Sequence, residues 1–303
     1  MTSRTVIAIV GGGLMGHGIA QVFARAGHAV RVYDPAPAIL ATLDERIRKN
    51  LSDLGQDAGA AERVTGHAVL AEAVAGAGIV FEAGPENLAL KRQIFAGIEA
   101  AASPAAILAS NTSVIPITLI MSGLERAERA LGTHWWNPPY LVPLVEVIKT
   151  PSTSAAAVGA MTALLTAAGK TPVTVEKDVP GFIGNRLQHA LWREAIALVA
   201  NGVCDAKTVD TVVKASFGRR LAVLGPLENA DLVGTDLTLA IHESVLADLD
   251  RTPGPSPYLK ALVAAGKLGM KSGEGFQQWT AEQQAALRKR VFEHLKALDT
   301  TGI

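Results

Sequence analysis

A glycine-rich turn near the start of the chain constrains the fold more than any other feature. Gly11, Gly13 and Gly16 form the pattern G-x-G-x-x-G. The apolar stretch Thr5–Val10 before the turn predicts a strand, and Leu14–Ala26 after it predicts a helix. A strand, a glycine turn and a helix in this order are typical of a domain that binds the phosphates of a dinucleotide.

Each glycine of this turn has a physical role in holding a pyrophosphate. Gly11 permits the tight turn out of the strand, Gly13 lets the backbone approach the ligand, and Gly16 lets the helix pack close to the sheet. Leu14 and Met15 begin the helix, whose free N–H groups and positive dipole end attract an anion. We therefore predict that these five residues bind the phosphates of the cofactor.

An acidic residue after the second strand indicates which dinucleotide is bound. The predicted strand Ala29–Tyr33 ends directly before Asp34, which follows Gly16 by about 20 residues. A carboxylate at this distance can accept hydrogen bonds from the adenosine ribose and would repel a 2′-phosphate. The spacing therefore predicts NAD rather than NADP as the cofactor. The alternative interpretation is an ordinary glycine turn followed by an unrelated loop aspartate.

Up to about residue 175, short β-branched stretches alternate with Ala-rich helical patterns. Further strands are predicted at Ile79–Glu82, Ala106–Ala109, Ala130–His134, Leu144–Ile148 and Pro172–Val175, and further helices at Leu88–Ala101 and Ala155–Ala168. Such alternation predicts an α/β fold, a Rossmann-like doubly wound and mostly parallel sheet with helices on both faces.

The pattern changes after the segment Lys177–Gly181. Long helical patterns follow at Phe182–Asn201 and Asp205–Phe217, and no convincing strand is found beyond them. We therefore predict two domains, an NAD-binding domain of residues 1–178 and an all-helical domain of residues 179–303. The apolar helices of the second domain are candidates for pairing with a second subunit.

The bulk composition argues against several classes of function. Lys and Arg together number 28, as do Asp and Glu, so the zero formal net charge gives no support for a nucleic acid or an acidic membrane as partner. The apolar start is soon broken by glycines, so it predicts neither a signal peptide nor a membrane span. The single Cys204 fits a reducing compartment. We expect a cytoplasmic protein that binds a small molecule and no metal.

A histidine and a glutamate on successive predicted strands form a second constellation. His134 ends one apolar strand, and Glu146 lies in the next between Val145 and Val147. If the strands are neighbours, the two side chains can meet, and a buried carboxylate needs a partner. Such a pair suits a base that takes a hydroxyl proton while hydride leaves the same carbon for a nicotinamide. A purely structural His–Glu pair explains the spacing equally well.

Seven short motifs, taken in order, resemble the L-3-hydroxyacyl-CoA dehydrogenase family. They are Gly11–Gly18, Phe81–Asn87 with Lys91, Ser110–Ser113, Thr133–Asn137, Leu144–Ile148, Pro180–Leu187 and Lys271–Phe276. Any one of them could arise by chance, but the ordered set is highly specific and spans nearly the whole chain. The resemblance implies a Rossmann-like domain followed by a helical domain that forms a homodimer.

The resemblance also implies roles for individual residues. His134 would be the catalytic base, Glu146 its orienting partner, and Ser113 and Asn185 would hydrogen-bond the substrate oxygen. The nicotinamide end of the cofactor site would be lined by Glu86, Lys91, Asn111, Asn137 and Lys271. Each also has a simpler structural interpretation: Ser113 or Asn185 could cap a helix, and the lysines could be surface charges.

Two departures from the family pattern concern the substrate. His134 is followed by Trp135-Trp136-Asn137-Pro138-Pro139-Tyr140. This form is more similar to relatives that oxidise free hydroxy acids, such as the L-gulonate dehydrogenase and lambda-crystallin branch, carnitine dehydrogenase and a dehydrogenase of pyridine carboxylates. The stretch from Asp34 to Val64 intersperses its few basic residues with acids, whereas the phosphates of CoA favour clustered Arg and Lys.

We predict an NAD-dependent oxidoreductase that interconverts a secondary alcohol and a ketone. The family resemblance implies a short L-3-hydroxyacyl-CoA and its 3-ketoacyl-CoA as the first substrate pair, and hence a place in fatty acid metabolism. The alternative is a free 3-hydroxy acid or another small hydroxy carboxylate without CoA. A non-catalytic NAD-binding or crystallin-type structural protein would not need the complete set of Ser113, His134, Glu146 and Asn185.

Overall fold

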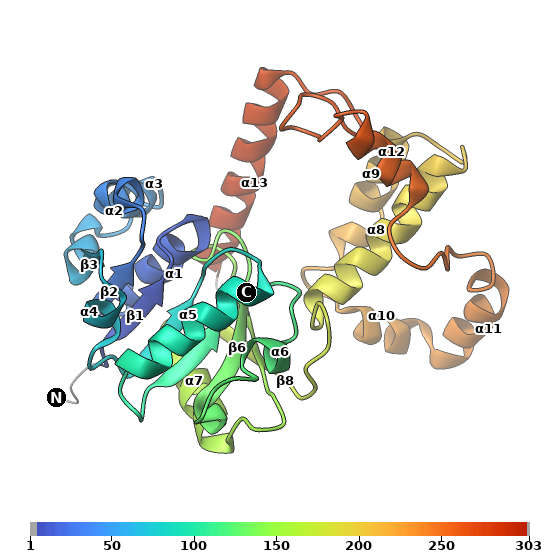
Figure 1. Ribbon diagram of the computed structural model, residues 1–303. Helices are drawn as coiled ribbons and strands as arrows, with labels where there is room; N and C mark the ends of the chain where they lie inside the picture. Colours follow the sequence, from blue (N-terminus) through green and yellow to red (C-terminus); the bar gives the residue numbers. More distant parts are fainter. Residues whose placement is uncertain (1–4, 302–303) are drawn as a thin grey trace. The chain divides into compact units, whose positions relative to one another are not determined.

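The computed structural model describes residues 5–301, and Figure 1 follows the chain through them. The chain forms two compact units. The first contains the chain up to Arg186 together with the end of the last helix from His294, and the second contains Leu187–Glu293.

Within the described residues, eight strands form one mixed sheet in the first unit. They are β1 (Ile7–Val10), β2 (Val30–Tyr33), β3 (Val64–His67), β4 (Ile79–Glu82), β5 (Ile107–Ser110), β6 (Ala130–Trp135), β7 (Leu144–Ile148) and β8 (Thr171–Val175). Their order is β3-β2-β1-β4-β5-β6-β7-β8. The first six strands in this order are parallel, whereas β7 is antiparallel to β6 and parallel to β8. The predicted Rossmann-like, mostly parallel sheet is confirmed.

Helices cover both faces of this sheet. They are α1 (Leu14–Arg25), α2 (Pro37–Ala41), α3 (Leu43–Asp53), α4 (Leu70–Val74), α5 (Leu88–Ala101), α6 (Ile117–Ile120) and α7 (Ala155–Ala167). Because side chains alternate along a strand, Ile7 and Ile9 of β1 join one core with α1, α3 and α7, while Ala8 and Val10 join the other with α4, α5 and α6. Two separate cores thus hold the carboxyl ends of the strands in a fixed order.

Strand β3 was not predicted from the sequence. It pairs only with β2, at the edge of the sheet, and Thr65 and Gly66 within it are exposed. An edge strand with a central glycine lacks the continuous apolar run that marks the inner, doubly covered strands. Strand β1, in contrast, is buried along its whole length.

The second unit is helical, as predicted. It contains most of α8 (Gly184–Ala200), then α9 (Ala206–Ala215), α10 (Pro226–Val233), α11 (Thr235–Val245), α12 (Pro257–Ala264) and the start of α13 (Ala281–Thr301). Among the described residues of this unit, β-pairing is limited to isolated bridges, between Gly269 and Glu274 and between Glu274 and Gln278. In the part of the chain that the structure describes, no helix has both the length and the apolar character needed to cross a membrane.

Candidate active site

The phosphate loop lies at the carboxyl end of β1, where the strand order reverses between β2 and β4. Gly11 has a φ of 107°, and a Cβ on it would lie 2.7 Å from the Ala83 carbonyl oxygen. A Cβ on Gly16 would lie 1.7 Å from the Gly11 carbonyl oxygen, whereas one on Gly13 would meet nothing within 4 Å. Gly11 and Gly16 are therefore required by the backbone, and Gly13 borders open space that fits a pyrophosphate.

The carboxylate of Asp34 is fixed beside this loop. Its Oδ2 accepts the Gly12 N–H at 2.8 Å, and its Oδ1 accepts the Ala36 N–H at 2.9 Å. An ionised carboxylate can accept about four hydrogen bonds, so acceptor capacity remains for ribose hydroxyls. The loop and the acid together fit the adenosine half of NAD.

The antiparallel pairing of β6 and β7 brings His134 and Glu146 together. The two residues are direct cross-strand partners, and the imidazole Nδ1 lies 2.6 Å from the carboxylate Oε2. Their exposed fractions are 3% and 0%. Since a carboxylate oxygen accepts, Nδ1 carries the proton, and Nε2 is the nitrogen that can exchange a proton with a ligand.

The second oxygen of Glu146 is also satisfied. Its Oε1 accepts the backbone N–H groups of Ile183 at 2.8 Å and Gly184 at 3.1 Å, where α8 begins. Burial alone would raise the pKa of Glu146, but the bond with His134 and the two backbone donors outweigh it and lower the pKa below its ordinary value. The residue therefore stays ionised and accepts the hydrogen bond from Nδ1 of His134.

Replacing Glu146 by glutamine is expected to change how thermal stability depends on pH. Because the folded pKa is lowered, the carboxylate stabilises the folded chain above the ordinary value of 4.5, and this contribution is lost as the pH falls through the folded pKa. The variant lacks it at every pH. The difference in Tm between the two proteins should thus shrink below about pH 4.5. A difference that stays constant on acidification would contradict the assignment.

Two aromatic rings hold the imidazole of His134 in place. The ring centroids of Trp136 and Phe182 lie 5.2 and 5.5 Å from that of His134. A Cβ on Gly184 would come within 2.4 Å of the Trp136 ring, so the start of α8 needs glycine at this position. The contact with Phe182 was not evident from the sequence pattern, because Phe182 is distant from His134 in sequence.

Ser113 and Asn185 are neighbours in the first unit. The Asn185 side-chain amide donates to the Ser113 carbonyl oxygen at 2.8 Å. Glu86 in turn accepts the Ser113 N–H at 3.1 Å. Ser113 does not cap a helix: α6 has Pro116 at its N-cap without a side-chain hydrogen bond, and in the turn before it the Thr112 hydroxyl oxygen accepts the Ile115 N–H. Both residues are thus linked to the segment around Gly184 that also holds the carboxylate of the dyad.

Lys91 is fully buried on α5 and forms an ion pair that sequence reasoning missed. Its ammonium lies 2.7 and 3.0 Å from the two carboxylate oxygens of Glu82, which is equally buried at the end of β4. The Ser110 hydroxyl and the Gly84 N–H also donate to Glu82. An acid at the end of a wholly apolar strand was the available signal, since such an acid needs a partner.

The remaining predicted residues lie in different surroundings. Asn111 is buried after β5, where its side-chain oxygen accepts the Trp135 N–H at 3.1 Å. Asn137 is exposed in the segment after β6. Lys271 is exposed in a turn of the second unit. Apart from Asn137, the predicted residues of the first unit thus lie at the ends of neighbouring strands or are joined to one another by hydrogen bonds.

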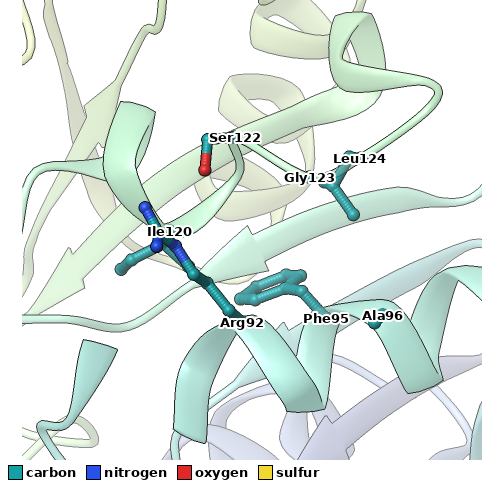
Figure 2. A pocket seen from close by; sticks show the side chains of 7 residues that line it. All are labelled: Arg92, Phe95, Ala96, Ile120, Ser122, Gly123 and Leu124. Atoms are coloured by element: carbon teal, nitrogen blue, oxygen red, sulfur yellow. The ribbon is translucent and has the colours of Figure 1, made fainter. Parts of the chain in front are cut away.

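One cavity outside this site lies in the first unit. A cavity of about 280 Å³ beside α5 is shown in Figure 2. It is lined by Arg92, Phe95, Ala96, Ile120, Ser122, Gly123 and Leu124. None of these belongs to the candidate site, and Arg92 is engaged with the Leu119 carbonyl oxygen at 2.8 Å. Within residues 5–301, no group of three or more His, Cys, Asp or Glu side chains could hold a metal ion.

The fold and the site together define a class of protein. A dinucleotide-binding loop lies where the strand order of the sheet reverses, and a buried His–Glu pair lies on the same sheet. These two features are characteristic of an NAD-dependent dehydrogenase. Residues 6–179 match the description "3-hydroxyacyl-CoA dehydrogenase, NAD binding domain", and residues 181–279 match "3-hydroxyacyl-CoA dehydrogenase, C-terminal domain". The chain belongs to the 3-hydroxyacyl-CoA dehydrogenase family, which confirms the predicted resemblance.

Two relatives and one solved structure illustrate the range of the family. The 5-formyl-3-hydroxy-2-methylpyridine 4-carboxylate 5-dehydrogenase of Mesorhizobium japonicum is 39% identical in an alignment that covers 96% of this chain and 96% of the relative. A probable 3-hydroxybutyryl-CoA dehydrogenase of Bacillus subtilis is 38% identical over 90% of this chain and 96% of its own. A crystal structure of a 5-formyl-3-hydroxy-2-methylpyridine 4-carboxylic acid 5-dehydrogenase, an NAD+-dependent dismutase, has a TM-score of 0.91 at 35% identity, with 99% and 98% of the two chains covered.

Proposed function

We propose that this NAD-dependent dehydrogenase acts on a small hydroxy or carbonyl compound that bears a free carboxylate and carries no CoA. This was the alternative substrate class in the sequence prediction. The observation that supports it most is that the basic side chains between Asp34 and Val64 bind to acidic or carbonyl groups of the chain itself. The similarity to a dehydrogenase of a pyridine carboxylate agrees with it.

The basic residues between Asp34 and Val64 are occupied by groups of the chain itself. Arg48 pairs with Asp44 at 2.8 Å and Lys49 pairs with Asp53 at 2.7 Å, both along α3. The guanidinium groups of the two further arginines of this segment donate to backbone carbonyl groups. The phosphates of CoA favour clustered Arg and Lys with free donors. A segment whose cations are already paired is a poor clamp for such a ligand.

The second candidate is an L-3-hydroxyacyl-CoA, which was the first substrate in the sequence prediction. Membership of the family supports it, as does the similarity to the probable 3-hydroxybutyryl-CoA dehydrogenase of Bacillus subtilis. A CoA thioester would imply a part in fatty acid metabolism. Both candidates share the same redox step, so the choice between them concerns only how the rest of the substrate is held.

The chain's own residues supply the proton chemistry of this step. In the oxidative direction the Nε2 of His134 takes the hydroxyl proton of the substrate, and Glu146 stabilises the imidazolium that forms. We assign the hydrogen bonds to the substrate oxygen to Ser113 and Asn185, which the family resemblance implies and whose mutual contact supports it. When bound, NAD supplies the acceptor for the hydride that leaves the same carbon. In the reductive direction the imidazolium returns the proton to the carbonyl oxygen.

A matched pair of substrates tests the proposal. The oxidation of NADH is followed by absorbance with acetoacetate and acetoacetyl-CoA, which share one acyl group, and with a panel of other small keto and aldehyde carboxylates. We expect at least one free carboxylate to exceed acetoacetyl-CoA in kcat/KM by about tenfold or more. An enzyme strongly rejects a substrate whose polar groups, here those of CoA, find no partners in the site. A clear preference for acetoacetyl-CoA over the whole panel would establish the second candidate instead.

We infer that the second unit mediates a homodimer. Its helices α8–α12 contain no buried residue in the described chain, and many of their large apolar side chains are exposed. Those more than half exposed include Leu187, Val212, Leu227, Leu232 and Leu239. Apolar exposure on this scale is typical of surfaces that pair with another subunit. The cytoplasmic location expected from the single cysteine stays a prediction.

A further inference from the structure

Arg46 links helix α3 to the phosphate loop. In Figure 1, α3 lies beside α1, and the two helices are in contact. The guanidinium Nη2 of Arg46 donates to the carbonyl oxygens of Gly12 and Ile39, each at 3.0 Å, and its Nε donates to that of Thr42 at 3.3 Å. One side chain thus joins the glycine turn, α2 and the start of α3.

The backbone of Gly12 is held on both sides by groups of opposite charge. Its N–H donates to Asp34 Oδ2 at 2.8 Å, and its carbonyl oxygen accepts from Arg46 at 3.0 Å. The next carbonyl group, that of Gly13, accepts from His17 Nδ1 at 2.7 Å. Two successive carbonyl groups of the loop are therefore directed at side-chain donors of the protein.

The direction of these carbonyl groups determines the direction of the N–H groups. In a planar trans peptide, the C=O of one residue and the N–H of the next point in opposite directions. Holding the Gly12 and Gly13 carbonyl groups against Arg46 and His17 therefore points the N–H groups of Gly13 and Leu14 the other way. N–H groups at this helix start are the donors that a pyrophosphate uses, and carbonyl oxygens turned toward it would repel it.

Arg46 is also the cation at this end of the site. Burial lowers the pKa of the neighbouring His17; the bond to Gly13 opposes that shift, and the charge of Arg46 adds to it. His17 therefore acts as a neutral donor. Arg46 attracts the carboxylate of Asp34 and is only partly buried.

We propose that Arg46 is a positioning residue for the cofactor, which preorganises the phosphate loop for the pyrophosphate by holding the Gly12 carbonyl group. The proposal concerns NAD binding and does not depend on which substrate is oxidised. It differs from a merely structural role for Arg46, in which the contacts to Ile39 and Thr42 would only secure the helices. The two roles predict different effects on ligand affinity.

The test measures binding of ADP-ribose to the full chain by calorimetry, since this probe carries the pyrophosphate but no reactive nicotinamide. Arg46→Met is compared with Arg48→Met, which removes a cation two residues further along α3 that pairs with Asp44 at the surface. We expect Arg46→Met to raise the Kd about tenfold or more, since a charged hydrogen bond is lost, and Arg48→Met to leave it unchanged. In turnover, the KM for NAD should rise by more than kcat falls.

A lysine at the same position provides the second variant. Arg46→Lys keeps the charge but cannot contact two carbonyl groups in the same way, so its Kd should lie between those of the wild type and Arg46→Met. The proposal is overturned if Arg46→Met and Arg48→Met bind ADP-ribose equally, or if Arg46→Met lowers only the Tm. If Arg46→Met does not fold, an unchanged Kd for Arg46→Lys has the same meaning.

Discussion

Replacing His134 by glutamine is expected to lower kcat by about 10²–10⁴-fold, the usual range for loss of a general base. Glutamine cannot accept the hydroxyl proton at neutral pH, but its amide can still donate to the Oε2 of Glu146. The buried carboxylate therefore keeps a partner, and the loss should concern the reaction rather than the fold. Steady-state turnover with a substrate identified from the panel above measures the effect.

Two measurements separate this effect from a general disturbance. The Kd for NADH should stay close to that of the wild type, because His134 lies on β6 and the phosphate loop follows β1. His67→Gln, at the edge strand β3, changes the same type of residue away from the dyad and should leave kcat unchanged. A His134→Gln enzyme that retains nearly full activity would remove the proposed base from the mechanism.

Replacing Lys91 by methionine is expected to lower the free energy of unfolding by about 3–5 kcal/mol, the range for breaking a buried ion pair. Lys91 and Glu82 are both inaccessible to solvent, so the variant leaves a carboxylate buried with only the Ser110 hydroxyl and the Gly84 N–H as donors. Urea unfolding followed by circular dichroism measures the change.

The companion variants show whether the pairing itself is responsible. Adding Glu82→Gln to Lys91→Met removes the unpaired charge and should recover a large part of the lost stability, because removing both partners costs far less than removing one. Arg92→Met, one residue further along α5 on the rim of the cavity in Figure 2, should cost much less. A double variant as unstable as Lys91→Met would contradict this account.

The parts of the molecule that could be predicted from sequence are those with local signals. The glycine spacing after a buried strand indicated the phosphate loop, and the apolar strands around His134 and Glu146 indicated that the two could meet. Their pairing then followed from one antiparallel contact between β6 and β7. Short-range periodicity carries this information because each signal lies within a single turn or strand.

The features that escaped prediction depend on contacts that only the folded chain creates. Lys91 lies nine residues from Glu82, and the packing of α5 against β4 buries the two side chains together. Arg46 lies among mixed charges on α3, and nothing nearby in sequence indicates that it reaches back to Gly12. Lysine and arginine are exposed by default, so only the tertiary structure distinguishes the exceptions.

The reversal of direction between β6 and β7 has a consequence for how such an enzyme can diversify. The dyad is fixed by strand register, since His134 and Glu146 face each other across the ladder. The connection between the strands, residues 136–143, contains the Asn137-Pro138-Pro139-Tyr140 stretch that departs from the family pattern. Beyond Trp136, which contacts the imidazole of His134, mutations can accumulate in this connection without changing the register that pairs His134 with Glu146. Evolution can therefore change which substrate the enzyme accepts while the His134–Glu146 pair is retained.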